Sequence, residues 1–373
     1  MRVVHLSSVH LPADTRIALK MCASLAEAGH EVHLVVCGEE ADIPEWLKEK
    51  KVTVHLIKPA AGRRERMISK TREVFRAGAD LEGDIYHFHD PEGLPQALKW
   101  RKKLGRPFIY DIHEPYPDDI MSKEWLPLAL RWPVARAFAA YENYAAFRLD
   151  GLAATTDHIA APFTRHPRCV VIRNYPLKDE FQRPDTPARP EPGCFVYVGG
   201  LTRLRGVEKM IRAVELAKAP ARLVLAGRCE SQNLEAFIAD SPRVAWPGHL
   251  GRDDLGQLLA RACAGLLLLQ PNKAYLKVEA TKLFEYMAAG LPVVIASDFP
   301  TGRDIVTETG CGLLADPRNP RAVAEAMDYI MAHPDEAAAM GRRGRAAVEE
   351  RYNWEAEFPK LIRLYAALAG GKV

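Results

Sequence analysis

Lys282 and Glu285 stand three residues apart in the segment TKLFEYMAAGLPVVIAS, at residues 281–297. A helix would place both charges on one side of its first turn, with Thr281 as the N-cap. The N-terminus of a helix offers free N–H groups and partial positive charge, and it therefore binds phosphate. The pair could equally be a solvated ion pair on a surface helix, because such pairs are common and weak.

A second segment, YVGGLTRLRGVEKMIRAV at residues 197–214, has the pattern of a strand, a glycine turn, a basic loop and a helix. Gly199 and Gly200 would let the backbone approach a ligand, and Arg203 and Arg205 stand near the start of the helix. These features predict a cradle for a diphosphate, with a tight turn and solvated arginines as the alternative. The segment lacks GxGxxG, which argues against a nicotinamide or flavin dehydrogenase.

Two histidine-containing segments, YHFHDPE at 86–92 and YDIHEPYPDD at 110–119, each end a predicted strand. The carboxyl ends of parallel strands meet at one edge of a sheet, where ligands bind. His89 is therefore expected to line a cleft and to contact an acceptor, whereas strand alternation directs His87 into the core.

The turn HLPADTRIAL, residues 10–19, follows the first predicted strand. Asp14 and Arg16 could bind an acceptor or a phosphate there. A helix N-cap beside a solvated arginine explains the same residues equally well.

Strands and helices alternate along both halves of the chain, which predicts parallel sheets covered by helices on both faces. Strands are expected at residues 3–8, 31–37, 52–57, 84–89, 108–113, 151–156 and 170–174, and again at 194–200, 222–228, 244–248, 264–270, 292–297 and 310–316. The chain should close with helices at 319–332, 334–350 and 354–369.

The segment PLKDEFQRPDTPARPEPG, at residues 176–193, has five prolines and no periodicity, which is typical of a linker. A chain of 373 residues is also too long for one ordinary core. The predicted fold is α/β, with two Rossmann-like, doubly wound domains that face a central cleft. The expected domains are 1–178 and 179–353, with a last helix at about 354–373 that packs back on the first domain.

The composition is that of a soluble globular protein, with 48% hydrophobic and 27% charged residues. A net charge of +3 is too small to indicate nucleic acid as a partner. Seven scattered cysteines without CxxC favour reduced thiols in a cytoplasmic protein, and the spacing of ligand-type residues predicts no metal site. No window approaches the ~18 apolar residues that a membrane span requires.

The second half of the chain resembles the GT-B glycosyltransferases of glycosyltransferase family 4, which are retaining enzymes that use nucleotide-sugar donors. The resemblance rests, in order, on YVGGLTRLRGVEKMIRAV, on LVLAGR followed by VAWPGHLGRDDLGQLLARACAGLLLL, and on TKLFEYMAAGLPVVIAS. It continues through GCGLLADPRNPRAVAEAM and RYNWEAEFPKLIRLY, and more loosely through LAEAGHEVHLVV and DIYHFHD in the first half. It implies a GT-B fold and a transfer that requires no metal.

The resemblance assigns Glu285 to the ribose hydroxyls of the donor nucleotide, and a carboxylate suits a vicinal diol because it accepts two hydrogen bonds. Lys282 would then face the diphosphate. Family members usually carry an arginine and a lysine in the glycine turn; here Gly200 takes the first of these positions and Arg205 the second. Arg203 or Lys282 would therefore supply the missing charge.

Many family members have a further glutamate eight residues before the ribose-binding one, where it contacts the donor sugar. Lys277 stands at that position, and Glu279 follows two residues later. Either Glu279 substitutes for the glutamate, or Lys277 meets a sugar that carries a carboxylate.

The segment YDIHEPYPDD resembles the family segment whose histidine lies under the sugar, which makes His113 the expected catalytic residue. Arg205 and Lys282 would stabilise the leaving diphosphate, and Glu114 would orient His113 or the acceptor.

These residues predict a transferase that moves a sugar from a nucleotide-diphosphate donor, with UDP favoured over GDP, to a glycan or lipid-linked acceptor in surface polysaccharide assembly. The alternatives are a nucleotide-sugar-binding scaffold without activity and a GT-B epimerase. Basic residues at 62–76 and mixed aromatic and basic residues at 123–148 leave open a peripheral contact with the inner face of the membrane. A core-packing helix with a basic outer face is the alternative for those segments.

Overall fold

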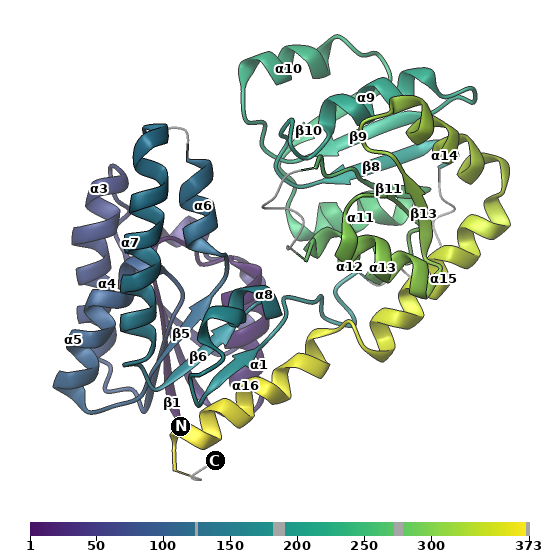
Figure 1. Ribbon diagram of the computed structural model, residues 1–373. Coiled ribbons are helices and arrows are strands. Elements are labelled where there is room, and N and C mark those ends of the chain that lie inside the picture. Colours follow the sequence, from purple (N-terminus) through teal and green to yellow (C-terminus); the bar gives the residue numbers. More distant parts are fainter. Residues whose placement is uncertain (124–125, 182–190, 272–278, 371–373) are drawn as a thin grey trace. The chain divides into compact units, whose positions relative to one another are not determined.

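The computed structural model describes residues 1–123, 126–181, 191–271 and 279–370. Contacts divide the chain into two compact units (Figure 1): unit 1 holds Met1–Asn174 and Glu357–Val373, and unit 2 holds Tyr175–Ala356. Each unit is built on a parallel β-sheet flanked by helices, which confirms the predicted fold of two doubly wound α/β domains.

The sheet of unit 1 has the strand order β3-β2-β1-β4-β5-β6-β7. Its strands are β1 (Arg2–Ser7), β2 (Glu31–Cys37), β3 (Val52–Ile57), β4 (Ile85–Phe88), β5 (Phe108–Ile112), β6 (Gly151–Ala154) and β7 (Cys169–Val171). The order reverses between β1 and β4, and doubly wound sheets bind ligands outside the carboxyl ends of such strands.

The helical elements of unit 1 fill the connections between these strands. They are η1 (Thr15–Cys22), α1 (Ala23–Glu27), η2 (Glu40–Asp42), α2 (Glu45–Glu49), α3 (Arg63–Glu65), η3 (Arg66–Lys70), α4 (Thr71–Ala79), η4 (Pro91–Gly93), α5 (Leu94–Leu104), α6 (Tyr116–Ser122), α7 (Leu128–Ala146), α8 (Asp157–Ala160) and η5 (Ala161–Phe163).

The sheet of unit 2 has the order β10-β9-β8-β11-β12-β13 and reverses between β8 and β11. Its strands are β8 (Cys194–Val198), β9 (Arg222–Ala226), β10 (Val244–Gly248), β11 (Ala264–Leu267), β12 (Val293–Ala296) and β13 (Gly312–Ala315). The helices are α9 (Val207–Leu216), α10 (Gln232–Ala239), α11 (Arg252–Arg261), α12 (Thr281–Ala288), α13 (Pro300–Thr309), α14 (Pro320–Ala332) and α15 (Pro334–Glu350).

The predicted strands and the three closing helices are all found. The central strands are largely apolar and buried on both faces, whereas the edge strands β3, β7 and β10 are only partly buried or exposed. The last helix, α16 (Trp354–Leu368), begins in unit 2 and continues into unit 1. There a methyl group on Gly151 would lie 3.2 Å from Leu364 Cδ1, so α16 packs closely against β6. The expected linker at 176–193 includes residues 182–190, which lie outside the described part of the chain.

Candidate functional site

The glycine turn of unit 2 follows β8 at the point where the strand order reverses. Gly199 has φ +137°, and a methyl group on Gly227 would lie only 1.8 Å from the Gly199 carbonyl oxygen. A side chain at 227 would therefore displace the turn. The two backbones approach each other closely because neither residue has a side chain.

Two cations converge on this turn. A methyl group placed on Gly199 would lie 3.0 Å from Arg205 Nη1 and 3.7 Å from Lys282 Cε, and one on Gly200 would lie 3.5 Å from the same Arg205 nitrogen. The structure thus brings Gly199, Gly200, Arg205 and Lys282 together, as predicted. With Glu285 they form what we call the glycine-turn site.

Lys282 Nζ lies 2.8 Å from Glu285 Oε2, and both side chains are partly exposed. The prediction that Thr281 caps this helix is wrong: the N-cap is Ala280, and Thr281 is the first residue of α12. Among the described residues no side chain caps α12, and none caps α9, whose N-cap is Gly206. Both helix N-termini therefore keep N–H groups without a side-chain acceptor, which favours an anionic ligand.

Arg203 is directed elsewhere, because its Nε lies 2.7 Å from Glu208 Oε1 and its side chain is 67% exposed. Of the two candidates for the missing charge, Lys282 is therefore the one that the structure places beside the turn. Glu279 lies two residues before α12. Burial raises the pKa of the Tyr352 phenol, and Glu279 adds a smaller effect in the same direction. Lys277 lies outside the described residues.

Arg252, which the sequence reading did not single out, interacts electrostatically with Glu285. Burial lowers the pKa of its guanidinium, and Glu285 acts in the opposite direction. Arg252 begins α11 and forms an ion pair with Glu180. No sequence motif links Arg252 to Glu285, because the two residues lie on different helices.

In unit 1, polar residues alternate along three adjacent strands. His5 pairs in register with His87 between β1 and β4, and β5 carries Asp111, followed two residues later by His113. Because residues two apart in a strand face the same side, these side chains meet above one face of the sheet. We call His5, His87, His89, His113, Asp111 and Arg16 the histidine network.

Asp111 lies at the centre of this network and is completely buried. Its carboxylate accepts hydrogen bonds from Arg16 Nε (2.9 Å), Arg16 Nη2 (2.7 Å), His89 Nδ1 (3.0 Å) and His113 Nε2 (2.8 Å). Burial alone would raise the pKa of this carboxyl, but Arg16 and His113 hold it well below its ordinary value. Asp111 is therefore an anion.

An anionic acceptor at Asp111 fixes the protons of its neighbours. His113 must carry its proton on Nε2, and His89 must carry its proton on Nδ1. The Nε2 of His89 then accepts from His5 Nδ1 at 2.8 Å. Burial lowers the pKa of His5 and His89, so both rings stay neutral.

The network ends on α16. The Tyr365 hydroxyl lies 3.3 Å from His5 Nε2 and 2.7 Å from His87 Nδ1, so one hydroxyl can donate to His5 and accept from His87. His87 is fully buried, as predicted, and burial lowers its pKa well below the ordinary value. Its Nε2 has no hydrogen-bond partner in the described structure.

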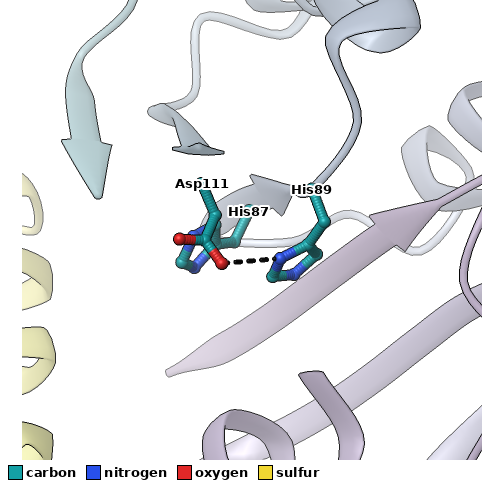
Figure 2. A group of neighbouring side chains, drawn as sticks. All are labelled: His87, His89 and Asp111. Carbon is teal, nitrogen blue, oxygen red and sulfur yellow. Dashed lines mark hydrogen bonds and ion pairs between the residues drawn. The ribbon is translucent and has the colours of Figure 1, made fainter. Parts of the chain in front are cut away.

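Figure 2 shows His87, His89 and Asp111, whose ligand-type atoms lie within 4.8 Å of one another. Such groups can bind a transition metal. Here, however, Asp111 already accepts four hydrogen bonds, and two of them come from the Arg16 guanidinium, which would repel a cation. The geometry therefore favours a hydrogen-bonded network over a metal centre.

Two predictions for unit 1 need correction. His89 was expected to line a cleft, but its ring is completely buried among His5, Asp111 and His113. The Arg16 side chain was expected to contact an acceptor, but it is only 4% exposed and is held by Asp111 and the Ile172 carbonyl. Both residues can influence a substrate only through His113.

His10, which the sequence reading missed, lies between two carboxylates. Its Nδ1 is 2.9 Å from Asp14 Oδ2, and its Nε2 is 3.6 Å from Asp90 Oδ1. Burial would lower the pKa of His10, but Asp14 and Asp90 raise it to about 9. The ring centroid of this imidazolium is 5.0 Å from that of His113.

Asp14 also accepts hydrogen bonds from the backbone N–H groups of Arg16 and Ile17, so it is the N-cap of η1. Asp14 thus has the N-cap role that was the alternative prediction for the turn at residues 10–19. Glu114 is exposed and directly follows His113. Contacts of Asp14 or Glu114 with an acceptor remain predictions.

Two family models match this chain one after the other. Residues 15–175 match the glycosyl transferase 4-like domain, and residues 178–347 match the glycosyl transferases group 1. D-rhamnosyltransferase WbpZ of Pseudomonas aeruginosa is 22% identical over 94% of this chain and 92% of its own length.

Solved structures resemble the chain over its full length. Sucrose-phosphate synthase from Thermosynechococcus elongatus aligns with a TM-score of 0.76 and 18% identity, covering 100% of both chains. HepE of Anabaena, in complex with UDP and glucose, aligns with a TM-score of 0.72 and 15% identity over 99% of this chain and 100% of that one. At these identities the likeness shows a shared fold.

The pairing of His10 with two carboxylates predicts a pH-dependent stability. Because the folded-state pKa of about 9 exceeds the ordinary value of 6.5, the stabilisation is complete below pH 6.5 and is lost as pH rises through 9. Chemical denaturation should show a loss of at most about 3 kcal/mol between pH 6.5 and 9.5. His10→Gln should remove this slope, whereas His158→Gln, at a partly exposed histidine of unit 1, should keep it. Equal slopes in wild type and His10→Gln would refute the assignment.

Proposed function

The chain belongs to the GT-B glycosyltransferases, and on that basis we propose that it transfers a sugar, with retention, from a nucleoside-diphosphate sugar to a glycan or lipid-linked acceptor in surface polysaccharide assembly. A UDP-sugar is the favoured donor. HepE, a structure of the same fold, is in complex with UDP and glucose, which supports this choice.

One observation carries the proposal: Arg205 and Lys282 converge on a glycine turn between two helix N-termini that lack side-chain caps. Free N–H groups and two cations suit a diphosphate, which carries its negative charge on several oxygens. Glu285 lies one turn further along α12 and would accept hydrogen bonds from the two ribose hydroxyls. When Glu285 binds the ribose, its ion pair with Lys282 would break, and Lys282 would then be able to bind the diphosphate.

During transfer, negative charge develops on the leaving diphosphate. Fixed donors that already point at this position lower the barrier, because they need no reorganisation during the reaction. The acceptor hydroxyl attacks from the face that the diphosphate leaves, and the departing phosphate oxygen takes its proton. These steps assign Arg205 and Lys282 to charge stabilisation and require no metal ion.

His113 would act on the transferring sugar. Its Nε2–H is held by Asp111, so its Nδ1 is the ring atom left to meet a substrate hydroxyl. Arg16 and His89 are positioning residues in this scheme, because they keep Asp111 ionised and in place. His10 adds a positive charge beside His113.

Replacement of Glu285 tests the donor site. Glu285→Ala should weaken UDP binding by about ten- to a hundredfold, because two hydrogen bonds from the ribose hydroxyls to a charged acceptor are lost. Titration calorimetry with UDP and GDP measures this, and Glu325→Ala, at an exposed glutamate of α14, is the matched control.

Each titration should be repeated in EDTA, where we expect unchanged affinity. Unaltered UDP affinity of Glu285→Ala would remove the ribose assignment. Loss of binding in EDTA would contradict the metal-independent scheme and direct attention to His87, His89 and Asp111.

Replacement of His113 tests the catalytic assignment. His113→Ala should lower the transfer rate about 100-fold while UDP affinity stays within a few-fold, because the nucleotide contacts lie in unit 2. Single-turnover transfer from a panel of nucleotide sugars gives the rate, with His158→Ala as the control.

A variant that keeps more than about a tenth of the wild-type rate would exclude this role for His113. Tight UDP binding by the wild type without hydrolysis or transfer of any donor would instead favour the nucleotide-sugar-binding scaffold.

A further inference from the structure

Large apolar side chains on the surface of unit 1 concentrate on α6 and α7. Leu128 is 77% exposed, Trp132 64% and Tyr144 53%. We call the exposed set the α6–α7 face; it consists of Met121, Leu128, Leu130, Trp132, Val134, Tyr141, Tyr144 and Phe147. Soluble proteins rarely leave so many large apolar side chains in water on neighbouring elements unless they bind something there.

The exposure follows from how α7 packs. Its buried residues, which include Ala135, Glu142 and Ala145, leave most of the first ten residues of the helix in solvent. Arg131 holds α6 against α7 with hydrogen bonds from Nε to the Leu126 carbonyl (3.0 Å) and from Nη1 to the Met121 carbonyl (3.4 Å). The alternative of a core-packing helix with a basic outer face holds only in part, because α7 buries Ala145 and Ala146 in the core but its outer face is apolar as well as basic.

The charges around this face are predominantly basic. The acidic residues of α6 are paired: Asp119 lies 2.6 Å from Lys123, and Asp118 lies 3.5 Å from His158. Between Leu126 and Leu149 the sequence has Arg131, Arg136 and Arg148, and its only acidic residue is Glu142. Glu142 is buried and accepts a hydrogen bond from the Tyr110 hydroxyl at 3.0 Å, so it does not offset the arginines at the surface. Burial also raises its pKa to about 7.

Aromatic rings and arginines lie close together on the α6–α7 face. The Arg148 guanidinium carbon is 3.6 Å from the centroid of the Tyr144 ring, and Arg136 has no ion-pair partner among the described residues. Tryptophan, tyrosine and arginine are enriched at the boundary between lipid headgroups and acyl chains. A protein partner would need acidic groups to match these arginines. In the described part of the chain, a second copy of this face would offer only Asp118 and Asp119 of α6, and Asp119 is already paired with Lys123.

A second segment of unit 1 has the same character. Met67 is 43% and Ile68 47% exposed, and they follow directly on the segment 63–66, which has three arginines and Glu65. Both this segment and the start of α7 lie at the end of unit 1 that is uppermost in Figure 1.

We propose that the α6–α7 face docks on an anionic lipid surface. The apolar and aromatic side chains would enter the headgroup region, and Arg131, Arg136 and Arg148 would bind lipid phosphates. No helix in the described part of the chain is long and apolar enough to cross a bilayer, so the contact is peripheral.

The inference rests on the proposed function, because it specifies where a lipid-linked acceptor would be met. β5 ends at Ile112, His113 follows, and α6 begins at Tyr116, so the helix that carries Met121 starts three residues after the proposed catalytic histidine. A lipid-linked acceptor held at the membrane surface would thus arrive beside the residues that act on it.

Flotation of the full chain with vesicles tests the proposal. The wild type should bind phosphatidylglycerol-containing vesicles at least tenfold more strongly than phosphatidylcholine vesicles, because each arginine gains from surface charge. The double variant Leu128→Ser/Trp132→Ser should lower binding at least tenfold. Leu216→Ser, at a leucine that is 50% exposed at the end of α9, should bind like the wild type.

Three results would overturn the proposal. These are wild-type binding to neither vesicle, undiminished binding by the double variant, or a dimer in light scattering that the double variant abolishes, which would make a second copy the occupant. UDP affinity, measured without vesicles, should be the same in wild type and double variant. A failure of vesicle binding with intact UDP binding and transfer to a soluble acceptor would thus remove the membrane contact and leave the proposed function standing.

Discussion

A buried ion pair between Arg16 and Asp111 determines how the centre of unit 1 is built. Removing both charges from water is costly, and the cost is offset only where the remaining donors and acceptors are satisfied. Arg16 meets this demand with two hydrogen bonds to Asp111 and one to the Ile172 carbonyl. Asp111 meets it with four donors. Neither residue could be lost alone without leaving a buried, unpaired charge.

The protonation pattern follows from this pair. An ionised Asp111 requires N–H groups from His89 and His113. The tautomer of His89 then determines which nitrogen of His5 carries the proton, and the hydrogen bonds continue through the Tyr365 hydroxyl to His87. The residues come from β1, β4, β5, η1 and α16, so the network joins the first and last helical segments of the chain. Its exposed end is His113, and unit 2 supplies the separate glycine-turn site with its own cations.

Local features were predictable from the sequence. Continuous apolar strands, glycines at turns and the spacing of Lys282 and Glu285 each have a short-range cause, and the structure shows each of them. The histidine network was not predictable, because it depends on the register of strands that are about eighty residues apart. His10 was missed for the same reason, since Asp90 reaches it from another strand end. The α7 segment was left open between a membrane contact and a core-packing helix, because sequence pattern alone cannot tell which side of a helix remains uncovered.

The direct test of the account is the position of the protons on the histidine rings. Long-range ¹H–¹⁵N spectra of protein labelled at histidine, assigned by single substitutions, report which ring nitrogen carries hydrogen. The account predicts His113 with its proton on Nε2, and His5 and His89 neutral at pH 7 with their protons on Nδ1. A His113 ring protonated on Nδ1 alone, or a charged His89 at pH 7, would contradict the buried Arg16–Asp111 pair as the group that organises this centre.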